Sequence, residues 1–185
     1  FLYEINLITG QKNKIGRLYI NNISSLVFDV NDTLYGIDNR NLYQINTETG
    51  VATQIGDMQN YFNHLAWDGE RLFAKNYSSR QIFEIDSDNG SANFYKELTI
   101  ENNNDLYEFT FDKENKLWGK TGPKDVTSME VDSNQVILST SLSKSFNKLT
   151  ADLSIDTDSD GMSDYWEEHY SFNANDISDA ELDED

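Results

Sequence analysis

The chain has 185 residues, of which 37% are hydrophobic and 12% aromatic, so it has enough apolar side chains to build a hydrophobic core. Its formal net charge of -19 at pH 7 argues against binding to nucleic acid or to anionic membranes, because phosphate groups are bound by patches of Lys and Arg. The absence of cysteine excludes disulfides, thiolate zinc sites and cysteine nucleophiles.

The N-terminal residues carry no signal-peptide pattern, and no apolar run approaches the roughly 18 residues of a membrane span. The chain begins at Phe1 and ends at Asp185 in the middle of repeating patterns. We therefore interpret it as a processed product or an excised part of a longer polypeptide.

A sequence repeat starts with the first residues of the chain. A five-residue motif with apolar residues at its first, second and fourth positions recurs at intervals of 40 residues, and a glycine stands four residues after each copy. We expect these glycines to supply the positive φ of a turn between two strands. The copies are Leu2–Asn6, Leu42–Asn46 and Ile82–Asp86, with a weaker fourth at Met129–Asp132, and the glycines are Gly10, Gly50 and Gly90.

A second motif falls between these copies, and it combines apolar residues with an aspartate. We expect the aspartates to bond backbone groups in tight turns, because a carboxylate accepts hydrogen bonds from nearby backbone N–H groups. An aromatic residue that follows each of the first three aspartates is predicted to pack between repeats, with a row of ligand-stacking rings as the alternative. The aspartates are Asp29, Asp68, Asp112 and Asp152, and the aromatic residues are Tyr35, Phe73 and Trp118.

Each unit of about 40 residues contains four short apolar or alternating runs, which predict four β-strands. In the second unit these runs cover residues 26–29, 33–38, 41–46 and 51–56, and polar turn residues separate them. The pattern resembles that of bacterial β-propellers over about residues 1–153. The resemblance implies an all-β fold built from four-stranded blades, and such propellers serve as binding platforms, as adhesion modules and sometimes as enzymes.

The strand count leaves two arrangements of the ring open. The chain opens with the third and fourth strands of a blade (residues 2–6 and 12–18), three full blades follow, and residues 146–153 predict one more first strand. Either the chain forms a four-bladed ring in which one thin blade is completed from both chain ends, or it is part of a larger ring with blades ahead of Phe1.

Residues 154–185 form a second predicted module, in the part of the chain where acids accumulate. From residue 149 to the end there are 13 acidic residues and no Lys or Arg. A twelve-residue segment matches the spacing of a calcium-binding loop, with glycine at its sixth position. Its carboxylates would repel one another without a cation, so the segment predicts a Ca²⁺ site. The expected ligands are Asp156, Asp158, Asp160, the carbonyl of Met162, Asp164 and Glu167.

The residues after this EF-hand-like loop, Tyr165–Phe172, favour a helix, whereas the residues before it do not. This layout resembles the cysteine-free thrombospondin type 3 repeats near the ends of secreted bacterial proteins. The resemblance implies calcium-dependent folding, an extracellular or cell-surface location and a role as spacer or connector. A second, incomplete calcium site is predicted from Asn175, Asp176, Asp179, Asp183 and Asp185.

No catalytic constellation stands out in the sequence. His64 is expected in a loop or at a blade edge just before a first strand, and His169 on the predicted tail helix as a packing or surface residue. There is no Gly-Xaa-Ser-Xaa-Gly elbow, paired metal-histidine motif or Walker glycine loop, although a pair of catalytic carboxylates stays possible among so many acids.

Three functions are consistent with these patterns. The first is a secreted or cell-surface calcium-binding protein whose propeller acts as a binding or adhesion module for an extracellular protein or carbohydrate. The second is an extracellular hydrolase or lyase with an active site in the propeller channel. The third is a structural connector in a larger surface protein. The first is favoured because the repeats, the acidity and the absence of cysteine all suit it.

Overall fold

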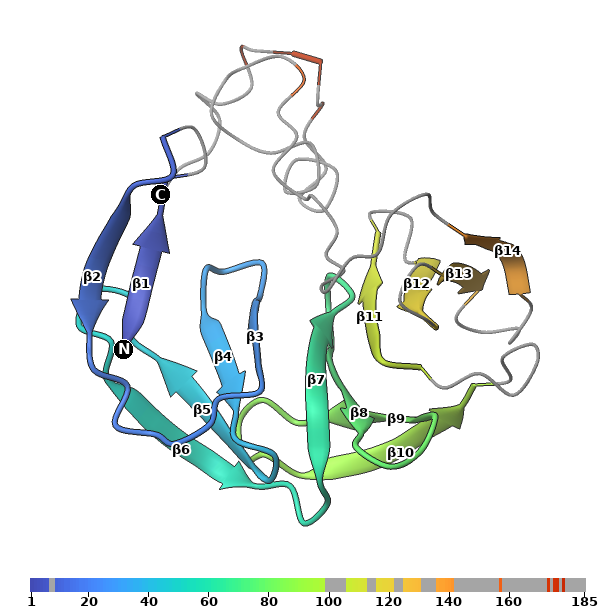
Figure 1. Cartoon of the computed structure of the whole chain (residues 1–185), viewed down its shortest axis with the longest axis horizontal. Coiled ribbons are helices and arrows are strands. Elements are labelled where there is room, and N and C mark those ends of the chain that lie inside the picture. Colours follow the sequence, from blue (N-terminus) through green and yellow to red (C-terminus); the bar gives the residue numbers. More distant parts are fainter. Residues whose placement is uncertain are drawn as a thin grey trace.

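The computed structural model describes residues 1–6, 9–98, 106–112, 116–121, 125–130 and 136–141, together with the single residues 157, 173, 175, 176 and 178. Within these residues the chain is all-β and contains fourteen strands and no helix (Figure 1). The strands are β1 (Leu2–Ile5), β2 (Lys12–Gly16), β3 (Ser25–Phe28), β4 (Leu34–Ile37), β5 (Asn41–Ile45), β6 (Ala52–Asp57), β7 (Phe62–Trp67), β8 (Leu72–Asn76), β9 (Gln81–Ile85), β10 (Ala92–Glu97), β11 (Glu108–Phe111), β12 (Lys116–Lys120), β13 (Asp125–Glu130) and β14 (Val136–Ser141).

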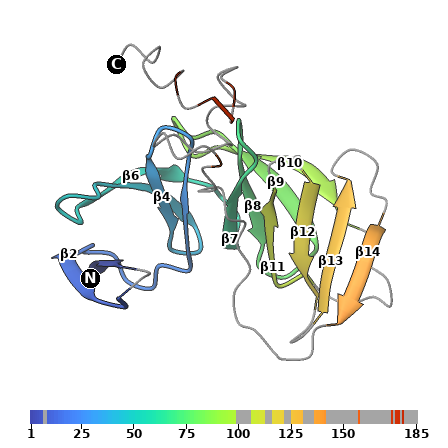
Figure 2. The ribbon, with the colours of Figure 1, turned by 90° about the horizontal axis from the view of Figure 1, so that it is seen from above.

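The strands form one two-stranded sheet and three four-stranded sheets, in which sequence neighbours pair antiparallel. We call β1–β2 blade 1, β3–β6 blade 2, β7–β10 blade 3 and β11–β14 blade 4. The blades follow one another around an arc, with β3, β7 and β11 on its inner side (Figure 1), and the view from above in Figure 2 shows the same order. The predicted half blade and three full blades are confirmed, with strand ends that differ by a few residues from those expected.

The aspartates of the second motif hold the turns between first and second strands. The Asp29 carboxylate accepts hydrogen bonds from the backbone N–H groups of Asn31 and Thr33 at 2.9 and 2.8 Å. Asp68 and Asp112 occupy the same place in blades 3 and 4 and accept backbone hydrogen bonds in the same way. The predicted structural role is therefore confirmed for these three residues, and Asp152 lies outside the described residues.

The turns between third and fourth strands repeat with the same chemistry in blades 1, 2 and 3. In blade 2, the Asn46 side chain accepts hydrogen bonds from the backbone N–H groups of Glu48 and Thr49, and the N–H of Gly50 donates to the Asn46 carbonyl at 2.8 Å. Gly50 has a φ of +73°, and Gly10 and Gly90 have φ values of +69° and +75°. The positive φ predicted for the three glycines is confirmed.

Each fourth strand carries a β-bulge at the same position. In blade 2, Leu42 pairs with Gly56 and Tyr43 with Gln54, so that Ile55 is the extra residue. The register shifts in the same way in the other three blades. Because the bulge redirects the side chain, Ile55 packs against the core between blades 2 and 3, and Ile15 and Tyr95 pack in the same way elsewhere.

Apolar side chains from facing sheets form the core between blades. The largest cluster joins blades 2 and 3 and includes Ile37, Leu42, Phe62, Leu72 and Phe83, all of them buried. Tyr35 and Phe73 are buried in these interfaces, which confirms the packing role predicted for them. Trp118 is half-buried, and its indole N–H donates to Asp112 at 2.5 Å.

Pairs of glycines bring neighbouring blades into backbone contact. A Cβ built on Gly56, in β6, would lie 1.9 Å from the carbonyl oxygen of Asn89, in the turn that contains Gly90. One blade earlier, a Cβ on Gly16 would lie 1.8 Å from the carbonyl oxygen of Thr49, beside Gly50. A side chain at either glycine is therefore incompatible with the observed approach of the two blades.

Candidate functional site

A groove runs along the inner strands of three blades. It has a volume of about 400 Å³, and β3, β7, β11 and the residues just before β3 line it. The groove wall combines apolar side chains with hydroxyl groups, which is the composition of many ligand pockets. Its lining includes Ser25, Leu26, His64, Leu65, Phe109 and Thr110.

Side chains from two inner strands reach across to the next inner strand. The Ser25 hydroxyl on β3 accepts a hydrogen bond from the backbone N–H of Leu65 on β7, at 3.0 Å. At the same position one blade later, Nε2 of His64 on β7 lies 2.7 Å from the carbonyl oxygen of Phe109 on β11. Ser25 and His64 are both buried. The two side chains therefore tie three inner strands together along the groove.

His64 thus lies inside strand β7 and is 8% exposed, so the expectation that it would lie in a loop or at a blade edge is wrong. The reason is that β7 begins at Phe62, three residues earlier than the apolar pattern indicated. Because a carbonyl oxygen only accepts hydrogen bonds, Nε2 must carry the proton and donate it to Phe109. The imidazole also packs against the Phe109 ring, with the ring centres 5.4 Å apart.

A buried lysine that the sequence pattern did not indicate lies directly beside His64. Lys75 on β8 pairs with His64 across the strands, and its side chain is 1% exposed. Its ammonium group donates a hydrogen bond to the carbonyl oxygen of Asn76 at 2.9 Å. The equivalent residues are Ile37 on β4 and Lys120 on β12, so the repeat carries either an apolar residue or a lysine at this position and gave no signal that Lys75 would be buried.

Exposed tyrosines stand at the end of the inner strands. Tyr61 immediately precedes β7, Tyr77 immediately follows β8, and a backbone hydrogen bond of 2.8 Å joins the two residues. Tyr107, which precedes β11, is exposed as well. Tyrosine combines an apolar ring with a hydroxyl group and is enriched in binding surfaces.

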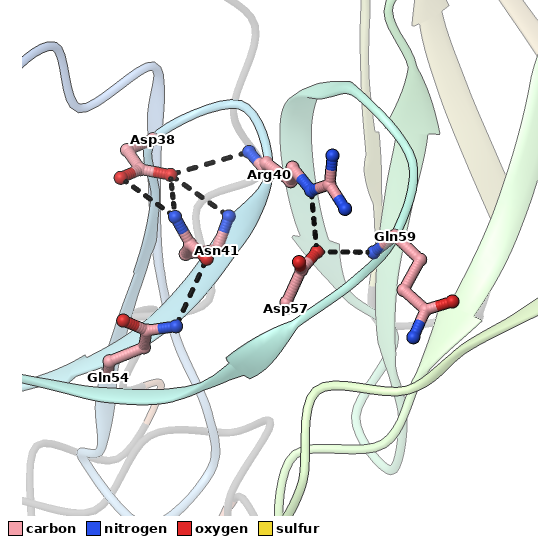
Figure 3. Close-up of polar contacts among 6 residues, drawn as sticks. All are labelled: Asp38, Arg40, Asn41, Gln54, Asp57 and Gln59. Atoms are coloured by element: carbon pink, nitrogen blue, oxygen red, sulfur yellow. Dashed lines mark hydrogen bonds and ion pairs between the residues drawn. The ribbon is translucent and has the colours of Figure 1, made fainter.

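A polar network holds the turn between β4 and β5 (Figure 3). The Asp38 carboxylate accepts a hydrogen bond from the backbone N–H of Asn41 at 2.9 Å, and Gln54 donates to the Asn41 side chain at 3.1 Å. The Tyr43 hydroxyl also donates to the Asp38 carboxylate, at 2.7 Å. Burial raises the pKa of Asp38, but these hydrogen bonds outweigh burial and leave it below its usual value. Burial and the bond to Asp38 raise the pKa of Tyr43 to about 12.

Next to this network, Arg40 forms an ion pair with Asp57, with Nε and Oδ1 2.8 Å apart. The same oxygen of Asp57 accepts a hydrogen bond from the backbone N–H of Gln59 at 2.8 Å (Figure 3). The hydrogen bond from Arg40 lowers the pKa of Asp57. These polar groups are engaged with one another, so they stabilise the turn and are poorly placed to act on a ligand.

The residues of the predicted main calcium site, namely Asp156, Asp158, Asp160, Met162, Asp164 and Glu167, lie outside the described residues, as does His169. Two members of the second predicted site are described. The N–H groups of Asn175 and Asp176 both donate to the carbonyl oxygen of Asn173, and the Asp176 carboxylate accepts hydrogen bonds from Ser178. Asp179, Asp183 and Asp185 are not among the described residues. In the described part of the chain, no three His, Asp or Glu residues gather in a metal-binding group.

No protein-family model and no curated protein sequence matches the chain. Solved structures do match it, among them a gluconolactonase from Xanthomonas campestris, with 12% identity and a TM-score of 0.53 over 77% of this chain and 56% of the other. A protein of unknown function from Bacteroides thetaiotaomicron matches with 17% identity and a TM-score of 0.53, over 76% and 44%. An auxiliary nutrient binding protein from Bacteroides ovatus matches with 10% identity and a TM-score of 0.52, over 74% and 35%.

The chain has a β-propeller fold. It spans between 35% and 56% of the lengths of these three proteins, so it corresponds to only a part of each. A likeness at such low identity shows the fold alone. In the described residues, no helix of the propeller is long and apolar enough to cross a membrane.

Proposed function

We propose that the chain is a secreted or cell-surface calcium-binding protein whose propeller binds an extracellular protein or carbohydrate along the inner strands. The groove carries this proposal, because three blades contribute to one concave surface that combines apolar and hydroxyl-bearing side chains. The exposed tyrosines at the end of the inner strands extend this surface with rings suited to stacking on sugars or packing on peptides.

The groups with acid–base chemistry near the groove support a binding role over a catalytic one. His64 donates to a backbone carbonyl of the next blade, and Lys75 is buried and donates to the carbonyl of Asn76. The turn aspartates are engaged with backbone N–H groups. Side chains held in this way stabilise the walls of a site and are not poised for proton transfer.

The binding role is tested with a substitution that fills the groove. We expect Thr110→Trp to abolish binding to the oligosaccharides or peptides that an array identifies for the wild-type chain, because an indole occupies space that the groove offers to a ligand. Thr53→Trp, on the exposed surface of β6, is the matched control and should bind like the wild type. Equal binding by wild type and Thr110→Trp would place the ligand elsewhere and contradict the proposal.

The calcium part of the proposal rests on the donor set of residues 156–167. Oxygen ligands recur there at the first, third, fifth, seventh, ninth and twelfth positions, and Gly161 stands where the loop needs a sharp turn. When bound, Ca²⁺ would neutralise the repulsion among the carboxylates and hold this segment in one conformation. Magnesium suits the set less well, because it demands octahedral geometry and keeps its waters.

Calorimetric titration with calcium measures this directly. We expect the wild-type chain to bind one or two Ca²⁺ ions, and Asp156→Ala or Glu167→Ala to lose tight binding at the main loop. The variants should melt like the wild-type chain in chelator, since the core clusters of the described residues are built from propeller side chains. Asp32→Ala, in a turn of blade 2, is the matched control and should leave binding unchanged. Unfolding of the whole chain by chelator would contradict the division into two modules.

A further inference from the structure

Blades 1 and 2 expose apolar residues at positions whose described equivalents in other blades are buried. Ile5 on β1 is 51% exposed, whereas its equivalents Ile45 and Ile85 are each 3% exposed. On the first strand of blade 2, Leu26 is 43% exposed, whereas its equivalents Leu65 and Phe109 are 2% and 0% exposed. The comparison of equivalent residues thus shows that Ile5 and Leu26 occupy repeat positions that other strands normally cover.

The direction of the side chains identifies the strands that would cover these positions. Ser25 on β3 points toward blade 3, as its bond to Leu65 shows, and side chains alternate along a strand. Leu26 and Phe28 therefore lie on the face of blade 2 that is turned toward blade 1, the face that also carries Ile45 and packs on Leu2.

At the interface between blades 2 and 3, the corresponding face of blade 3 is covered. Leu65 and Trp67 belong to the cluster that joins blades 2 and 3, together with Val27 on β3 and Tyr35 and Ile37 on β4. These three residues come from the first and second strands of blade 2. Strands in the same positions of blade 1 would therefore cover Leu26 and Phe28.

The backbone hydrogen bonds of β1 lead to the same conclusion as the exposed side chains. Third strands β5 and β9 pair on both sides, with a second and a fourth strand, whereas in the described residues β1 pairs only with β2. One edge of β1 thus offers backbone N–H and C=O groups in the arrangement that accepts a further strand.

We propose that this edge of β1, together with Leu26 and Phe28, is a docking surface for a two-stranded β-hairpin that completes blade 1. The hairpin has the sequence pattern of this chain's own first and second strands, with apolar residues at the positions of Val27, Tyr35 and Ile37 and a hydrogen-bonding side chain at the position of Ser25. That side chain would meet the backbone of β3 as Ser25 meets β7. Residues 146–153 carry the first-strand motif alone, and a first strand by itself does not adjoin a third strand.

A segment of this chain can serve as the hairpin that tests the proposal. Asn41, the first residue of β5, is equivalent to Phe1, and three residues connect β4 to β5. A copy of residues 22–40 fused directly ahead of Phe1 therefore places a first and a second strand at the natural connection to β1. The matched control is the same fusion with Val27→Asp and Tyr35→Asp in the copy only, which removes the apolar contacts and leaves the length unchanged.

Hydrogen exchange and thermal unfolding are measured on the unfused chain, the fusion and the control. We expect the fusion to slow amide exchange in β1 and in residues 26–28 at least tenfold and to raise the melting temperature, and the control to do neither. Unchanged exchange in the fusion would overturn the proposal. Protection of the same amides in the unfused chain, whether as a monomer or as a dimer, would also overturn it, because another segment or a second copy would then occupy the surface.

Discussion

Replacing Gly56 with alanine is expected to lower the free energy of unfolding by about 3 kcal/mol or more. The added Cβ would lie 1.9 Å from the carbonyl oxygen of Asn89 and 2.8 Å from its carbonyl carbon. Both atoms belong to the backbone of a tight turn in the next blade, so no side chain can rotate away and the blades themselves must separate. A loss of this size is a large fraction of the stability of an ordinary domain. Denaturation with urea measures it.

A second glycine in the same repeat separates the clash from other effects of the substitution. Gly10 has no atoms within 4 Å of a built Cβ, and its φ is +69°. Gly10→Ala should therefore cost only the conformational penalty of an alanine in the left-handed region, about 1 to 2 kcal/mol. Gly50→Ala combines the two, because Gly50 has a φ of +73° and its Cβ would lie 2.8 Å from the backbone of Gly16. A Gly56→Ala variant as stable as wild type would show that the blades are not in close backbone contact.

Replacing Phe73 with alanine is expected to cost about 3–5 kcal/mol. The Phe73 side chain is fully buried between blades 3 and 4, with its ring centre 5.1 Å from that of Tyr95 and 5.3 Å from that of Phe111. Truncation removes these contacts and leaves a cavity between two sheets that cannot readily collapse. Thermal or urea denaturation measures the loss.

Phe94→Ala is the matched control for Phe73→Ala. Phe94 lies on β10 in the same blade, is 59% exposed and makes an edge contact with Phe83. Its truncation should cost no more than about 1 kcal/mol, because little buried surface is lost. Equal losses for the two variants would mean that the interface between blades 3 and 4 is not packed as described.

The two predictions concern interfaces that are built differently. Between blades 2 and 3, Gly56 and Gly90 permit backbone contact, whereas the residue 40 positions after Gly56 is Lys96. Between blades 3 and 4, the cluster around Phe73, Phe109 and Phe111 supplies aromatic contacts instead. The repeat therefore preserves the strand order of each blade while the contacts between blades vary.

The strands, turns and blade boundaries could be predicted because their determinants are local. Asp29 and Asn46 bond backbone groups within four residues, and Gly50 adopts the positive φ that its turn requires. Alternation of apolar residues assigned each strand a buried face, although the start of β7 was misplaced and His64 with it. The assignment of the calcium ligands stays a prediction from the sequence, because it depends on the spacing of residues within one short segment.

By itself, the sequence determined that this protein is all-β, that it is built from four-stranded blades, and which residues turn the chain, since each of these depends on neighbours a few residues away. Only the tertiary structure decided that His64 donates to Phe109, 45 residues further on, that Lys75 is buried beside it, and that Gly56 lies against the turn of another blade. It also decided that Ile5 and Leu26 are exposed at repeat positions that are elsewhere buried. The physical reason is that the sequence pattern sets which face of a strand is apolar, whereas burial depends on whether another sheet lies against that face.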